Sequence, residues 1–124
     1  MPQFVDNRPV AVRLCEDDRE CVYIKGKLGT ADRNRLTDAL LDIDREAAAG
    51  GAGAMALRSG RYLQALLEIS VVGWVAFDAD GHEIPFSLEQ LRLWDPDDPL
   101  LDKVYAEIAR LNPTLPGHRS MQST

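Results

Sequence analysis

The feature that most constrains the fold is a pair of short β-rich runs near the N-terminus. Residues 9–14 and 21–28 are separated by a polar stretch that has room only for a turn, which is typical of a β-hairpin. In the second run Val22 and Ile24 alternate with Cys, Tyr and Lys, so we expect one buried and one solvated face. A two-stranded hairpin is only marginally stable in water. It must therefore pack against helices of this chain or join the strands of a neighbour.

The hairpin is followed by a segment with helical periodicity. Thr30 is a good N-cap, and Leu36, Leu40, Ile43 and Ala47 recur at intervals of four, three and four residues. This spacing predicts an amphipathic helix whose apolar face points toward the core.

A second helix is predicted to begin near Ala54 or Leu57 and to continue to about Val72. The β-branched residues 69–77 at its end are also compatible with a strand, and beyond Val72 both alternatives stay open. The glycine-rich residues 50–53 between the two helices serve either as a hinge or as a simple helix–helix connection.

Capping signals mark two further helices. Ser87 with Gln90 three residues later forms a capping box at the start of a short helix. Asp97 or Asp98 caps the last helix, with Pro99 in its first turn, and the Asn-Pro pair at 112–113 ends it.

These segments predict an α+β fold, mostly helical, with an N-terminal β-hairpin and about four helices. Residues 1–113 are expected to form a single domain, and residues 114–124, which have no apolar pattern, a flexible C-terminal tail. The expected core consists of apolar residues on the inner helix faces and in the segment after the second helix: Leu36, Leu40, Ile43, Leu63, Leu66, Leu67, Trp74, Val104 and Ile108.

Length and charge narrow the range of partners and compartments. A chain of 124 residues with a net charge of −6 is one acidic domain, which argues against nucleic acid, because phosphate binding needs clustered Lys and Arg. The longest apolar run, residues 69–77, is too short to span a membrane. The N-terminus resembles neither a signal peptide nor a basic presequence. We therefore expect a cytosolic protein.

Cys15 and Cys21 flank the predicted hairpin tip. A disulfide between them is geometrically feasible, but a reducing cytosol favours two free thiols. A metal site would need further ligands, and both histidines lie far away in the sequence.

The stretch from Asp78 to Glu89 has some features of a calcium-binding loop. Counting from Asp78, oxygen ligands fall at positions 1, 3 and 12, where Asp78, Asp80 and Glu89 stand. The glycine comes two residues early, at Gly81, and the third small ligand is missing. The sequence therefore favours a tight turn, with Asp at its start and Gly where a positive φ is needed.

The sequence offers little support for catalysis. Residues 50–53 lack the Lys-Ser/Thr of a phosphate-binding loop, and there is no Gly-x-Ser-x-Gly elbow. His82 lies in the predicted turn and has no obvious catalytic neighbour. We expect a protein that is not an enzyme and that has no cofactor or metal.

The second half of the chain has a recognisable order of motifs. An apolar helix is followed by Val72-Gly-Trp-x-x-x-Asp-x-Asp-Gly-x-x-Ile-Pro-Phe-Ser87, by a short Leu-rich helix and by a helix that ends in Leu-Asn-Pro. This order resembles the tail assembly chaperones of long-tailed bacteriophages and related prophage tail proteins. The resemblance covers residues 23–113, apart from the glycine-rich residues 50–53 and the acidic residues 95–99.

The resemblance implies a non-enzymatic role in the host cytoplasm. Chaperones of this family coat the aggregation-prone tape measure protein before the tail tube polymerises, so the tape measure protein is the expected partner. The alternative is a small virion subunit of the neck, tail-completion or connector type, which would extend a neighbour's sheet. Self-association into a homo-oligomer is also left open.

Two elements are predicted to contact the partner. The first is the hairpin edge from Val22 to Leu28, since a strand edge offers unpaired N–H and C=O groups. The second is the face of the last helix, where Tyr105 combines apolar area with a polar tip. The predicted partner-binding residues are Val22, Tyr23, Ile24, Lys25, Leu28, Tyr105 and Leu111.

Overall fold

The computed structural model describes residues 1–6, 8–16, 19–49 and 54–115, without the side chains of 47–49 and 54–59. The elements in chain order are β1 (Pro9–Arg13), β2 (Cys21–Lys25), α1 (Thr30–Ala49), α2 (Ala54–Ser70), β3 (Val71–Val75), α3 (Leu88–Leu91) and α4 (Pro99–Leu111). The α+β class, the N-terminal hairpin and the four helices of this described part are confirmed. The glycine-rich residues 50–53 and most of the expected tail lie outside the described residues.

The hairpin is part of a three-stranded antiparallel sheet in the order β1-β2-β3. β2 is therefore the central strand, with Val22 opposite Val12 of β1 and Trp74 of β3. The prediction that α2 continues to about Val72 is wrong by two residues: the helix ends at Ser70 and β3 begins at Val71. The β-branched valines of this segment extend because they pair with β2.

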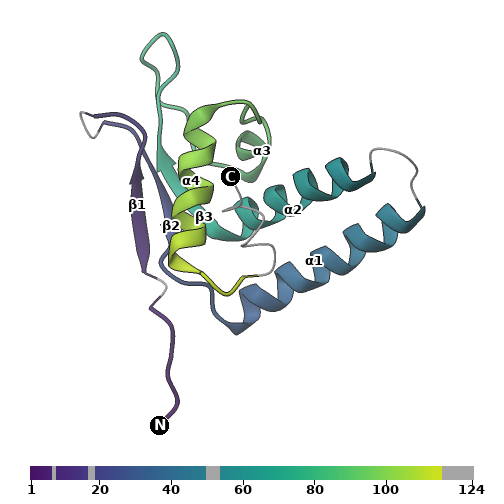
Figure 1. Cartoon of the computed structure of the whole chain (residues 1–124). Helices are drawn as coiled ribbons and strands as arrows, with labels where there is room; N and C mark the ends of the chain where they lie inside the picture. Colours follow the sequence, from purple (N-terminus) through teal and green to yellow (C-terminus); the bar gives the residue numbers. More distant parts are fainter. Residues whose placement is uncertain (7, 17–18, 50–53, 116–124) are drawn as a thin grey trace.

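The helices form two groups around the sheet (Figure 1). α4 lies across one face of the sheet, and its inner residues join those of the strands in a single core cluster. α1 and α2 pack side by side as a helical hairpin that extends away from the sheet, while α3 lies near the start of α4.

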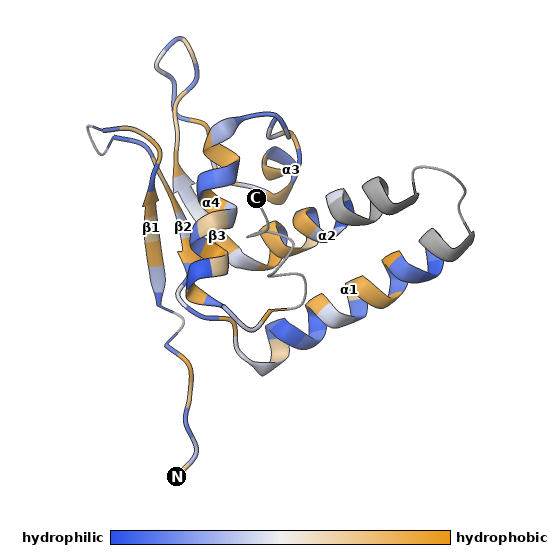
Figure 2. Ribbon diagram, viewed as in Figure 1, coloured by the Kyte–Doolittle hydropathy of each residue, from blue (hydrophilic) through white to orange (hydrophobic). Residues whose placement is uncertain are grey.

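The core follows the predicted periodicity. Figure 2 shows apolar residues recurring along α1 and α2 and on the strands. Six of the expected core residues are buried: Leu36, Ile43, Leu66, Leu67, Val104 and Ile108. Leu40, Leu63 and Trp74 are only half-buried and pack against the outside of this core, which corrects their expected placement. Leu115 is also buried, so the packed part of the chain extends at least to this residue.

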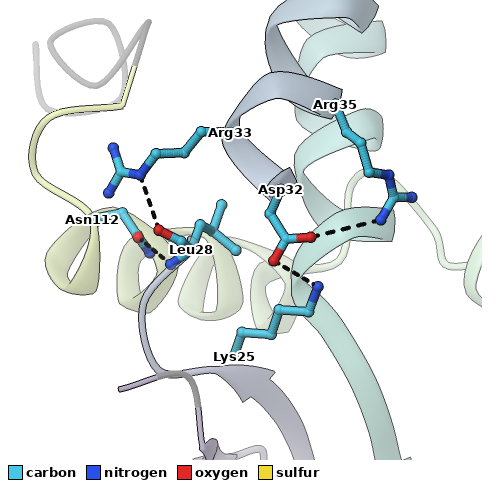
Figure 3. Close-up of polar contacts among 6 residues, drawn as sticks. All are labelled: Lys25, Leu28, Asp32, Arg33, Arg35 and Asn112. Carbon is cyan, nitrogen blue, oxygen red and sulfur yellow. Dashed lines mark hydrogen bonds and ion pairs between the residues drawn. The ribbon is translucent and has the colours of Figure 1, made fainter. Parts of the chain in front are cut away.

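The connection between β2 and α1 is held by side chains from two helices (Figure 3). Leu28 is fully buried, so both of its backbone polar groups need partners within the protein. Its N–H donates to Asn112 Oδ1 at 2.9 Å, and its C=O accepts from Arg33 Nε at 3.0 Å. The Asn112 amide also donates to the carbonyl of Ile108 at 2.9 Å. The end of α4 is thereby fixed to the start of α1.

Replacing Asn112 with alanine tests this connection. The change leaves the buried N–H of Leu28 without its acceptor, and we expect a loss of about 1–3 kcal/mol in the free energy of unfolding. Urea denaturation measures this loss. Asn34→Ala, at an exposed position of α1, is the matched control and should change stability by less than about 0.5 kcal/mol. Equal effects of the two substitutions would show that the Asn112 hydrogen bonds contribute nothing net.

Candidate functional site

A pocket of about 220 Å³ opens at the end of the sheet where β1 turns toward β2. We call it the aromatic pocket. Its lining comes from the strands, from the segment after β3 and from the α3–α4 region: Leu14, Glu20, Val22, Trp74, Ala76, Phe77, Ile84, Gln90, Leu93, Trp94, Asp98 and Leu100. Three separate stretches of the chain, 14–22, 74–84 and 90–100, thus build one site.

Trp74 is held in place by its indole N–H and by two aromatic neighbours. The N–H donates to the carbonyl of Ile84 at 2.8 Å. The Trp74 ring meets Phe86 edge-on, with centroids 4.9 Å apart, and meets Trp94 nearly at right angles, at 6.2 Å. Perpendicular arrangements of this kind are favourable for aromatic pairs. The two tryptophans therefore form a fixed corner in the pocket wall.

Asp98 both caps α4 and holds the second tryptophan. Its Oδ1 accepts from Leu100 N at 2.9 Å, which confirms Asp98 as the N-cap of α4, and its Oδ2 accepts from Trp94 Nε1 at 2.9 Å. The predicted cap Ser87 is also confirmed, since its hydroxyl accepts from Gln90 N at 3.0 Å. These caps fix where α3 and α4 start, and so they shape the pocket.

A further ion pair fixes the α3 region against α2. Arg92 donates to Glu68 Oε1 through Nε at 3.0 Å and through Nη2 at 2.7 Å. The next residue, Leu93, lines the pocket and has a side chain that is 75% exposed. The ion pair of Arg92 thus keeps the neighbouring Leu93 side chain at the pocket, where it is exposed to solvent.

The charged groups of the aromatic pocket are both acidic. Besides Asp98, Glu20 lines the pocket and accepts from the backbone N–H of Phe77 at 3.2 Å. Among the side chains that the structure describes, neither carboxylate forms an ion pair with a cation. The pocket thus combines aromatic walls, an exposed leucine and negative charge, a combination suited to binding a partner.

The predicted partner residues on β2 do not form an open strand edge. Val22, Ile24 and Leu28 are 0% exposed, and the expectation of an edge there is wrong because β3 pairs with the side of β2 that was thought to be free. Tyr23 is partly exposed on the opposite face of the sheet. Lys25 forms an ion pair with Asp32 of α1 at 2.8 Å (Figure 3).

The predicted partner residues on α4 are half-buried. Tyr105 and Leu111 both pack against the core cluster. Leu111 also lines an open hollow together with residues of β1 and with Gly26. A Cβ on Gly26 would lie 2.7 Å from the backbone oxygen of Asp6, so glycine is needed for the N-terminal segment to pass this close. The structure does not bring the seven predicted residues together on one surface.

The hairpin's open edge belongs to β1. Leu14 N donates to Glu20 O at 2.9 Å, and hydrogen-bonding directions alternate along an antiparallel strand. Pro9, Ala11 and Arg13 therefore direct their backbone groups away from β2. Pro9 has no N–H group, but at this position the N–H would point away from β2, so no hydrogen bond to β2 is lost. Proline is expected at such positions of an edge strand.

The predicted turn at Asp78 is confirmed. Gly81 has a φ of 82° and its N–H donates to the carbonyl of Asp78 at 3.0 Å. The Asp78 carboxylate accepts from the backbone N–H groups of Asp80 and His82, each at 2.9 Å. Asp78, Asp80 and His82 offer exposed ligand atoms within 4.8 Å of one another, and Glu89 is not among them. The hydrogen bonds of the turn hold these three residues close together, so their proximity does not by itself indicate a metal site.

Cys15 and Cys21 are not joined by a disulfide. The sheet register pairs Cys21 with Arg13, so Cys15 lies beyond its cross-strand position. The Cys15 sulfur instead accepts from the backbone N–H of Glu20 at 3.3 Å.

Sequence reasoning missed the aromatic pocket because its members are spread along the chain. Trp94 follows the predicted short helix and Glu20 lies in the predicted hairpin tip, and neither position by itself indicates a pocket. One signal was available: the chain has two tryptophans, and one of them follows Leu93 at the end of a short helix. Aromatic residues of this size are enriched at binding surfaces.

The alkaline stability of the protein should depend on Tyr105. Burial, and to a smaller extent the Asp102 carboxylate, raises the pKa of Tyr105 from 10.0 to about 12. The folded state keeps the phenol neutral at pH values where the unfolded chain ionises it. The resulting stabilisation is complete below pH 10 and is lost as the pH rises toward 12.

We expect Tyr105→Phe to show a smaller fall in the free energy of unfolding between pH 10 and 12 than the unmodified protein. Urea denaturation across this range measures the difference. In the folded state, phenolate absorbance should also lose its most alkaline step in the variant. Identical pH profiles for the two proteins would contradict the assignment.

In the described part of the chain, none of the helices has the length and apolar character needed to cross a membrane. Comparison of the chain with protein-family models, with curated proteins and with solved structures found no match.

Proposed function

We propose that this protein is a non-enzymatic tail assembly chaperone that binds the tape measure protein of a long-tailed phage or prophage. The observation that carries the binding role is the aromatic pocket with Leu93 exposed beside it. The choice of partner rests on the resemblance over residues 23–113.

The physical basis of this role is burial of apolar surface. Protein interfaces gain most of their affinity from a few aromatic and apolar anchors in well-packed pockets. Trp74 and Trp94 are fixed by hydrogen bonds before a partner arrives, so little side-chain freedom is lost on binding. The net charge of −6 helps to keep a complex with an aggregation-prone partner in solution.

The test uses two exposed leucines. Leu93→Ser removes the apolar side chain beside the aromatic pocket without adding a charge, and Leu41→Ser makes the same change on α1, where Leu41 is 57% exposed. We expect Leu93→Ser to reduce co-purification with the tape measure protein from phage-producing cells at least about tenfold, the equivalent of 1.4 kcal/mol, and Leu41→Ser to leave it unchanged. Circular dichroism checks that both variants fold.

The same cells provide a second measurement. A chaperone should be present in the lysate and missing from mature particles. A fixed stoichiometry in purified virions would reject the chaperone role.

The open edge of β1 favours a second candidate, a virion subunit of the neck, tail-completion or connector type. Such a subunit would add a neighbour's strand along the outward groups of Ala11 and Arg13. Parts of the edge oppose this, because Pro9 lacks a donor and Arg13 carries a charge.

Ala11→Pro tests the second candidate, since it removes an N–H that points away from β2. If the edge pairs with a neighbour, the variant should fail to enter particles while keeping its own fold by circular dichroism. If the protein is the proposed chaperone, Ala11→Pro should co-purify with the tape measure protein as well as the unmodified protein does.

A further inference from the structure

The polar groups in the aromatic pocket that can still bind a ligand are mainly hydrogen-bond acceptors. Both indole N–H groups are already used, Trp74 toward Ile84 O and Trp94 toward Asp98 Oδ2. The backbone N–H groups of Phe77 and Leu100 are used by the two carboxylates. Gln90 adds one neutral amide. A ligand that donates hydrogen bonds therefore fits this pocket better than one that accepts them.

The two carboxylates have unused capacity. An ionised carboxylate offers about four acceptor positions. Glu20 accepts one described hydrogen bond and Asp98 accepts two. Both side chains are half-buried, and no described cation pairs with either. Partial burial of an uncompensated charge is unfavourable, and a bound cation would offset that cost.

The walls suit a cation that has an apolar stem. Leu14, Ile84 and Phe77 provide aliphatic and aromatic surface, and the two indole planes meet at 88°. Lysine and arginine bury their methylene stems along such surface while the charged head reaches polar groups. A cation near an aromatic face gains further attraction.

The size of the pocket favours a side chain over a free ligand. Its volume of about 220 Å³ is below the range of about 300–1,000 Å³ that is usual for drug-sized ligands. Leu93 beside the pocket can contact an apolar neighbour of the inserted residue. We propose that the aromatic pocket binds a lysine or arginine side chain of a partner protein, presented next to an apolar residue. The inference deepens the proposed function and rests on it only for the partner being a protein.

The chain contains two tryptophans, and both line the aromatic pocket, so tryptophan fluorescence, excited at wavelengths where tyrosine does not absorb, reports on this site alone. The probes are three blocked tripeptides: Leu-Lys-Leu, Leu-Arg-Leu and Leu-norleucine-Leu, the last a neutral analogue of the lysine peptide. We expect saturable fluorescence changes with the two basic peptides and at least about tenfold weaker binding of the norleucine peptide. Added salt should weaken only the basic peptides.

Two substitutions remove a negative charge. Glu20→Gln retains an amide oxygen as the acceptor for Phe77 N. Asp98→Asn retains one oxygen to cap Leu100 N but loses the acceptor of Trp94 Nε1. Glu20→Gln should weaken the lysine peptide several-fold and leave the norleucine peptide unchanged, and Asp98→Asn should weaken the lysine peptide more than the norleucine peptide. Glu89→Gln, an exposed charge on α3 outside the pocket, is the control and should alter neither affinity.

The inference is overturned if the norleucine peptide binds as tightly as the lysine peptide, if no peptide changes the fluorescence, or if the charge-removing variants bind like the control. These measurements use the purified protein and need no phage component. If they fail while Leu93→Ser still reduces co-purification, the proposed function stands and the cation-binding pocket is rejected.

Discussion

The buried backbone of Leu28 is the constraint on which the arrangement of the helices depends. A fully buried residue between a strand and a helix has two backbone polar groups that water cannot reach. Asn112 from the end of α4 satisfies one, and Arg33 from the first turns of α1 satisfies the other. Because these partners come from different helices, satisfying Leu28 also fixes α4 across the sheet and α1 beside it. Lys25 and Asp32 add an ion pair at the same junction (Figure 3).

The aromatic pocket forms at the opposite end of α4. Asp98 starts this helix and orients Trp94 with the same carboxylate, so the helix cap and the pocket wall are one structural unit. Asn112 fixes the other end of α4, because the helix cannot shift along the sheet without breaking a buried hydrogen bond. This bond therefore also holds Asp98 and Trp94 in position in the pocket. The result is a partly apolar pocket with two carboxylates that no described cation neutralises, which is the basis of the proposed binding role.

The sequence predicted structure correctly where the interactions involved span only a few residues, as in helix caps and tight turns. Ser87 and Asp98 cap the helices that they precede, and Gly81 takes the positive φ that the Asp78 turn requires. The periodicity of α1 and α2 placed Leu36, Ile43 and Leu66 in the core. The partner-binding surface was assigned less well, because it depended on which side of β2 was free. The β-branched residues 71–75 were compatible with a continued helix or with a strand, and their pairing with β2 makes them a strand.

The sequence by itself determined the β-hairpin, the helices, the caps of α3 and α4 and the inward faces of the helices, because these follow from backbone preferences and side-chain periodicity within short windows. The tertiary structure alone decided that β2 is central, that β1 and β3 are the edge strands, and that Trp74 and Trp94 meet in one pocket with Glu20 and Asp98. These features depend on contacts between separate segments of the chain, such as the hydrogen bond between Glu20 and Phe77, which are 57 residues apart. Such contacts form when separate apolar faces are buried together, and no local pattern specifies which faces will meet.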